Sequence, residues 1–189
     1  MTTTLHIKNM VCPRCIMVVE NELKALGAEV QAVKLGYAEV TLPEAITLHI
    51  VDNKLKEFGF ELLYDADSIL AEEAKTAVLA YLKHLEQEGK NAKKLSDFVS
   101  SEIGKNYNYL SKIFSKQTGH TLEKYYILLR VEKVKELLDY DQLNVSEIAL
   151  QLGYSSVHYL SNQFKRITGL SISDYKKRLR INRGFLDDL

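Results

Sequence analysis

The chain has 189 residues, which is enough for two small domains that each bury a core of their own. Hydrophobic residues make up 46% and charged residues 26%, as in a soluble globular protein, and no apolar run approaches the roughly 20 residues that span a bilayer. Basic and acidic residues number 25 each, yet residues 1–64 carry a net charge of −2 and residues 95–183 a net charge of +5. Since the start also lacks the features of a signal peptide, we expect a cytoplasmic protein. Its basic half suits a polyanionic partner, although solvated lysines at a helix end would give the same charge.

The first 64 residues switch between the periodicities of strand and helix. Apolar residues alternate up to Met10 and then recur every third or fourth position until Gly27. Gly36 separates two Val-rich runs that predict a β-hairpin. The predicted elements are a strand at 5–10, a helix at 16–26, strands at 28–35 and 37–42, a helix at 48–58 and a strand at 60–64. Their order is βαββαβ.

Cys12 and Cys15 form a Cys-x-x-Cys pair where the first strand passes into the first helix, and Pro13 suits a first helical position. Backbone N–H groups and the helix dipole at that end favour thiolate over thiol, which makes Cys15 in particular a better metal ligand or nucleophile. Two thiolates so spaced can hold a soft ion in linear geometry, as Cu(I), Ag(I) and Hg(II) accept, whereas Zn(II) prefers four ligands. The pair also fits a redox couple or two reduced structural thiols. Neither His6 nor His49 is assigned as a third ligand.

Residues 4–64, with NMVCPRC in the first loop and EFGFELL near the end, resemble the heavy-metal-associated domain of copper chaperones and metal-pumping ATPases. The resemblance implies a ferredoxin-like fold, a metal bound by Cys12 and Cys15, and Met10 packed beneath the loop. Asn9 stands where that family usually has Gly, and Val11 where it has a small polar residue.

Polar residues interrupt both periodicities after the last predicted strand, which predicts a linker at 65–71. The predicted domains are therefore residues 1–64 and 72–189. The second begins with a helix whose apolar stripe runs from Ala74 to Leu85. We interpret this stripe as core, with contact to the metal domain as the alternative.

The segment YLSKIFSKQTG at 109–119 recurs as YLSNQFKRITG at 159–169. Each copy follows a short apolar helix and a tight turn near Gly104 or Gly153, the plan of a helix-turn-helix. Helical spacing predicts that one side of each recurring helix faces inward: Leu110, Ile113, Phe114 and Gln117 in the first copy, and Leu160, Gln163, Phe164 and Ile167 in the second. The opposite side of each helix is polar.

Residues 95–180 resemble the DNA-binding domain of AraC-type bacterial transcription regulators. The strongest similarity lies in VSEIALQLGYSSVHYLSNQFKRITGLSISDYKKR, at the Ile148-Ala149 pair, the Gly153-Tyr154 turn, the Phe164-Lys165 pair, Gly169 and Tyr175. The resemblance implies sequence-specific binding to double-stranded DNA. The fold class is therefore predicted as α+β: a ferredoxin-like βαββαβ domain followed by an all-α domain with two helix-turn-helix motifs joined by a linker helix.

The polar sides of the two recurring helices predict the residues that contact DNA. Side chains expected at base edges are Asn108, Ser111, Lys112, His158, Tyr159, Ser161 and Asn162, where a good pair supplies about 1–3 kcal/mol of discrimination. Side chains expected at phosphates are Lys105, Lys116, Lys165, Arg166 and Lys177. A continuous helical pattern at 121–138, roughly 27 Å long, would set the two helices about one duplex turn apart.

The leading hypothesis is a bacterial transcription regulator in which a soft metal, Cu(I) before Ag(I), Hg(II) or Zn(II), binds Cys12 and Cys15 and changes DNA binding. One rival is a thiol-redox regulator, which predicts a Cys12–Cys15 disulfide and little effect of chelators. Another is a metallochaperone with a docking domain. RNA polymerase and a metal-bridged second copy are further candidate partners, and a membrane is not. The chain has no Ser/His/Asp set, carboxylate pair or phosphate loop, so an enzyme is not expected.

Overall fold

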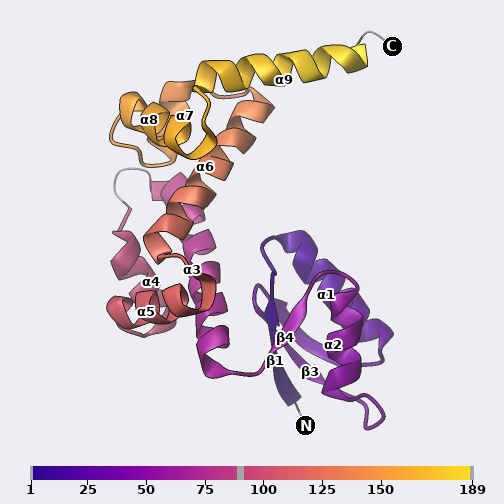
Figure 1. The fold of residues 1–189 in the computed structure, drawn as a ribbon. Coiled ribbons are helices and arrows are strands. Elements are labelled where there is room, and N and C mark those ends of the chain that lie inside the picture. The colour runs from indigo at the N-terminus through magenta and orange to yellow at the C-terminus, as the bar shows by residue number, and fades with distance from the viewer. Residues whose placement is uncertain (1, 89–91, 188–189) are drawn as a thin grey trace. The chain divides into compact units, whose positions relative to one another are not determined.

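The computed structural model describes residues 2–88 and 92–187, with side chains up to Leu179 (Figure 1). Met1 and Leu189, where the predicted domains begin and end, lie outside the described residues. Contacts group the chain into a first unit, Met1–Ala77 with Val99–Thr121, and a second unit, Val78–Phe98 with Leu122–Leu189. Within the described ranges, every helix is too short or too polar to traverse a lipid bilayer.

The first unit contains a four-stranded antiparallel sheet in the order β2-β3-β1-β4. Its elements are β1 (Thr2–Lys8), α1 (Pro13–Ala25), β2 (Glu29–Lys34), β3 (Tyr37–Thr41), α2 (Leu48–Lys56) and β4 (Glu61–Leu63), which is the order predicted from the sequence. Helices α1 and α2 lie side by side and pack on the sheet (Figure 1).

The core between this sheet and its helices forms because alternate strand residues and one face of each helix are apolar. Its buried members include Leu5 and Ile7 of β1, Ala38 and Val40 of β3, Val19 and Leu23 of α1, and Val51 and Leu55 of α2. The hairpin between β2 and β3 turns at Gly36, whose φ of +90° suits glycine and whose carbonyl accepts the Ile7 N–H at 2.8 Å.

Helix α3 (Ala66–Glu88) begins within the segment predicted as a linker. The Asp65 carboxylate accepts the backbone N–H of Ser68 at 2.8 Å, so it caps the first turn and starts the helix earlier than the apolar stripe indicates. Residues 66–77 of α3 belong to the first unit and residues 78–88 to the second.

The two sequence repeats have matching local structures. Helices α4 (Leu95–Ile103) and α5 (Tyr107–Thr118) make up the first, and α7 (Val145–Gln151) and α8 (Val157–Thr168) the second. Asn106 and Ser156 cap the N-termini of α5 and α8, and Gly119 and Gly169 end them with φ of 73° and 76°. The two copies thus agree in the residues that end their helices as well as in amino-acid sequence.

Helix α6 (Leu122–Tyr140) follows the first repeat and α9 (Ile172–Asp187) follows the second. In the second unit, α6, α7, α8 and α9 share a core, which includes Val131, Val134, Leu138, Ile148, Leu152, Leu160 and Phe164. Apart from Leu152, which caps the C-terminus of α7, each of these residues lies on the apolar side of its helix, so the helical periodicity of the sequence identifies this core.

Candidate metal loop and nucleic-acid interface

The candidate metal loop, residues 9–15 and called the metal loop below, joins β1 to α1. Cys12 is the N-cap residue of α1 and Pro13 occupies its first turn, as the sequence predicted. The backbone N–H of Cys15 donates to the Cys12 carbonyl at 3.0 Å, which folds the loop so that the two sulfur atoms lie 3.6 Å apart. Both thiols are free and half-buried, and Met10 is buried in the sheet core.

The loop favours a thiolate at Cys12, whereas the sequence had pointed to Cys15 in particular. The pKa of Cys12 is lowered, first because the backbone N–H of Cys15 hydrogen-bonds to its sulfur, and then because the Cys15 side chain does. The N–H groups of the first helical turn therefore favour the ionised sulfur, which is the form that binds metal.

The sulfur pair has nearly the separation that two ligands of one tetrahedral metal ion require. With metal–sulfur bonds of about 2.3 Å, neighbouring thiolates on a tetrahedral ion lie about 3.8 Å apart, close to the observed 3.6 Å. Within the described ranges, however, no group of three or more His, Cys, Asp or Glu side chains is arranged to hold a metal. With two sulfur donors the loop suits an ion that accepts two ligands, and linear coordination with bonds of about 2.3 Å would need the sulfurs to lie about 4.6 Å apart. A zinc tetrahedron would need further donors.

Asn9 fixes the start of the loop in a conformation that few residues other than glycine adopt. Its φ is 72°, and its side-chain Nδ2 donates to the Gly59 carbonyl at 3.0 Å. Its backbone N–H donates to Oε1 of Glu72 in α3 at 2.9 Å. The loop is therefore held from the turn before β4 and from α3, through Glu72, which lies outside the apolar stripe that the sequence analysis considered for such a contact.

The reading helices, α5 and α8, turn their predicted apolar sides inward. Leu110, Ile113 and Phe114 of α5 are buried, as are Leu160, Gln163 and Phe164 of α8. The prediction was wrong for Gln117, which is exposed near the C-terminus of α5. The Gln117 amide can hydrogen-bond to water in the last turn of the helix, so its exposure costs little free energy. Ile167, the apolar residue at the equivalent position of α8, is half-buried.

The predicted DNA-contacting residues of the first repeat are accessible. Asn108, Lys112 and Lys105 are exposed and Ser111 is half-buried. Lys116 is exposed too, but its Nζ lies 2.9 Å from Oδ2 of Asp67 in α3. The hydrogen bond with Asp67 raises the pKa of Lys116.

In the second repeat, His158, Tyr159, Asn162, Lys165 and Arg166 are exposed, and Ser161 is half-buried. Asn162 Nδ2 and His158 Nε2 are 2.9 Å apart, so one helical turn joins an amide to an imidazole. Tyr159, Asn162, Gln163 and Arg166 line a hollow of about 120 Å³. Lys177 of α9 is also exposed.

Arg130 of α6 positions the second reading helix, and sequence reasoning missed it. This arginine is buried, with 7% of its surface exposed, and its Nε donates to the Leu152 carbonyl at 2.9 Å. Its guanidinium stacks on the Tyr154 ring, and the Tyr154 hydroxyl donates to Oε1 of buried Gln163 at 2.9 Å. The sequence offered one signal for this role: Arg130 is a charged residue at a position where the helical spacing of residues 121–138 predicts an apolar one.

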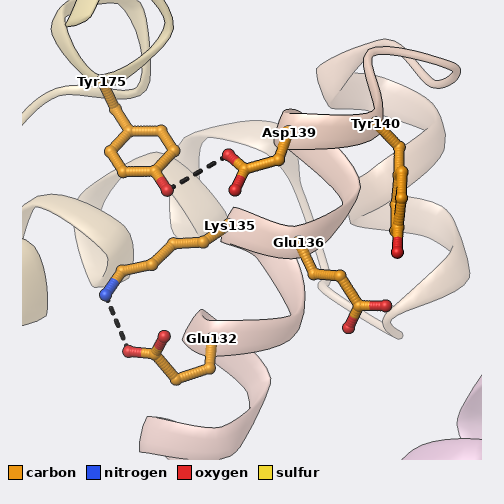
Figure 2. A pocket seen from close by; sticks show the side chains of 6 residues that line it. All are labelled: Glu132, Lys135, Glu136, Asp139, Tyr140 and Tyr175. Carbon is orange, nitrogen blue, oxygen red and sulfur yellow. Dashed lines mark hydrogen bonds and ion pairs between the residues drawn. The ribbon is translucent and has the colours of Figure 1, made fainter. Parts of the chain in front are cut away.

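A second hollow, of about 410 Å³, lies between α6 and α9 and is mainly acidic. Figure 2 shows its lining residues, with Lys135 paired to Glu132 and the Tyr175 hydroxyl directed at Asp139. Glu136 is paired with Lys133. Because carboxylates repel phosphates, this surface is not suited to nucleic acid.

Residues 99–178 match a protein family described as helix-turn-helix domain. Curated relatives include the Msm operon regulatory protein of Streptococcus mutans, 29% identical over 84 residues that cover 44% of this chain and 30% of that protein. Another is the HTH-type transcriptional activator RhaR of Salmonella typhi, 36% identical over 67 residues that cover 35% of this chain and 24% of that protein. The chain thus spans less than a third of the length of these relatives.

Among solved structures, the C-terminal domain of AraT, a response regulator from Geobacillus stearothermophilus, matches with a TM-score of 0.50 and 25% identity, over 60% of this chain and 88% of that one. Residues 99–178 match a helix-turn-helix domain, in agreement with the AraC-type helix-turn-helix domain that the sequence resemblance implied. The relatives carry the names of regulators and activators, in agreement with the prediction that this chain is not an enzyme.

Proposed function

We propose that this chain is a bacterial transcription regulator whose binding to promoter DNA responds to a soft metal ion held by Cys12 and Cys15. The regulator part rests on the AraC-type domain at residues 99–178 and on its two similarly capped reading helices. The metal part rests on one observation, the thiolate-favouring pair of sulfurs 3.6 Å apart at the start of α1.

In this proposal, the exposed sides of α5 and α8 enter the major groove. Asn108, Asn162 and Lys112 carry amide and ammonium groups that can pair with adenine or guanine. Lys105, Lys116, Lys165, Arg166 and Lys177 provide positive charge for phosphates. Gln163, Tyr154 and Arg130 stay within the protein and set the orientation of α8.

The N-terminal half would supply the metal response. A ferredoxin-like, heavy-metal-associated domain is supported by the order βαββαβ, the sheet order β2-β3-β1-β4 and the buried Met10. Cys12 and Cys15 would hold Cu(I), which accepts two sulfur ligands, and the bound ion would neutralise thiolate charge in the loop. Ag(I) or Hg(II) suits the same donors, and Zn(II) would need two more, for example from a second copy of the chain.

A thiol-redox regulator is the second candidate, and the same sulfur separation favours it. A disulfide needs an S–S bond of about 2.05 Å, so an approach of about 1.5 Å would join Cys12 and Cys15 within one loop. Oxidation and metal binding would then act on the same two atoms. They differ in that a chelator of Cu(I) reverses only metal binding.

A footprint on DNA from the neighbourhood of the chain's own gene tests the proposal. It is run with and without Cu(I) under reducing conditions, and then with an oxidant in the presence of a Cu(I) chelator. Protection of a discrete sequence that changes with Cu(I) supports metal control. A change that appears only with the oxidant supports the redox regulator, and the absence of any protected sequence contradicts DNA regulation itself.

A further inference from the structure

The first three turns of α3, residues 66–77, contact both the metal loop and the first reading helix. Glu72 Oε1 accepts the Asn9 N–H at 2.9 Å, and Asp67 Oδ2 lies 2.9 Å from Lys116 Nζ. The two acidic residues are five positions apart, or about 7.5 Å along the helix axis. One short piece of helix therefore joins the residue three positions before Cys12 to a lysine predicted to contact phosphate.

The contact with the metal loop is close and buried. Only 6% of Glu72 is exposed, and its second carboxylate oxygen accepts from Lys75 Nζ at 2.9 Å. One turn further along α3, Thr76 packs against the turn at Gly36: its Oγ1 would lie 3.4 Å from a Cβ atom added to that glycine. A buried carboxylate is costly unless its hydrogen bonds are satisfied. A movement of the loop that removes the Asn9 N–H from Glu72 therefore destabilises the packing of residues 66–77 against the loop, which we call the seated state of this segment.

The contact with the first reading helix is an exposed ion pair, so another anion can easily replace Asp67 beside Lys116. The side chains of Lys116 and Asp67 are 70% and 33% exposed, and such ion pairs stabilise a fold only weakly. Asp67 nevertheless forms an ion pair with the same Lys116 ammonium group that a DNA phosphate would contact. A DNA phosphate and Asp67 thus compete for one cation.

We propose that residues 66–77 couple the metal loop to DNA binding, with Glu72 as the residue that positions the loop and Asp67 as an internal competitor for Lys116. While the segment is seated, DNA affinity is lowered. Unseating it releases Asn9 and Lys116 together, and by linkage DNA binding must loosen the contact at Asn9. The metal arm of this inference rests on the whole proposed function, whereas the coupling of Asn9 to DNA rests only on its DNA-binding part.

The metal-free arm uses the full chain and the DNA sequence found by footprinting. We expect Asp67→Asn to tighten DNA binding about threefold, a change typical of one exposed ion pair. Glu73→Gln makes the same charge change at an exposed neighbour on the same helix and should leave affinity unchanged. Equal affinities of Asp67→Asn and Glu73→Gln would overturn the competitor role of Asp67.

Amide hydrogen exchange at Asn9 measures directly whether its N–H is hydrogen-bonded to Glu72. Protection should be lost in Glu72→Ala, retained in Glu72→Gln, which keeps an oxygen acceptor, and reduced in the wild type by saturating DNA. Unchanged protection with DNA bound would overturn the coupling, whether or not any metal binds.

The metal arm compares DNA affinity with and without one equivalent of Cu(I). Glu72→Ala should still bind Cu(I) through Cys12 and Cys15, yet its DNA affinity should no longer respond, while Glu73→Gln responds as the wild type does. An equal response in the wild type and Glu72→Ala would refute the coupling and leave metal control standing. A wild type that ignores Cu(I) refutes metal control, and the two metal-free measurements then decide the coupling.

Discussion

The guanidinium carbon of Arg130 lies 3.5 Å from the centroid of the Tyr154 ring. This contact joins α6 to the turn between α7 and α8, and the Arg130 Nε–H donates to the Leu152 carbonyl in that turn. Tyr154 in turn holds Gln163, so the orientation of the second reading helix depends on an arginine outside the motif. The orientation of the exposed side of α8, which is proposed to contact DNA, therefore depends on a buried cation in α6.

Replacing Arg130 with Met should destabilise the second unit by about 2–3 kcal/mol, because it removes a charged hydrogen bond and leaves the Leu152 carbonyl without its donor. Urea unfolding followed by circular dichroism measures the change. Arg178→Met, at an exposed position of α9, is the matched control and should change stability little. Equal stability of the two variants would contradict the role assigned to Arg130.

The second unit should lose stability at high pH. Burial raises the pKa of Tyr126 and of Tyr154 to about 12 from the ordinary 10.0. Both rings are neutral in the fold, so their contribution is complete below pH 10 and is lost as pH rises towards 12. A spectroscopic titration of tyrosinate should show late-titrating groups that include Tyr126 and Tyr154, one of which disappears in Tyr126→Phe. Titration of every tyrosine near pH 10 would rule out this burial effect.

Asn162 and Lys177 should differ in what they contribute to DNA binding. Asn162→Ala should cost about 1–3 kcal/mol on the preferred sequence and relax preference at one base. Lys177→Ala should weaken all sequences alike and reduce the salt slope by about 1. Binding isotherms on matched and altered sites at several salt concentrations distinguish these outcomes. Small and equal effects of both substitutions would mean that α8 does not enter the groove as proposed.

Periodicity predicted most of the fold because it depends on neighbouring residues. The alternation around Leu5 and Ile7, the helical spacing of Leu160 and Phe164 and the turn at Gly36 each reflect local geometry, and the structure confirms them. The start of α3 was placed too late because a side-chain cap at Asp65 outweighs the lack of apolar spacing.

The contacts that position the site were not predictable in this way. Arg130 pairs with a carbonyl 22 residues away, and Glu72 with an amide 63 residues away, so neither partner follows from sequence spacing. Lys116 was predicted as a phosphate ligand without its internal partner Asp67 for the same reason. The roles of Cys12, Cys15 and the groove-facing residues stay predictions that experiments must decide.

The affinity of the full chain for its footprinted DNA, measured with and without one equivalent of Cu(I) under reducing conditions, tests metal-controlled DNA binding most directly. The wild type should change its affinity by about fivefold or more, the usual lower range of coupling between two sites. The Cys12→Ser, Cys15→Ser double variant should bind the same DNA and show no change. An unresponsive wild type, or a double variant that responds equally, would contradict the account.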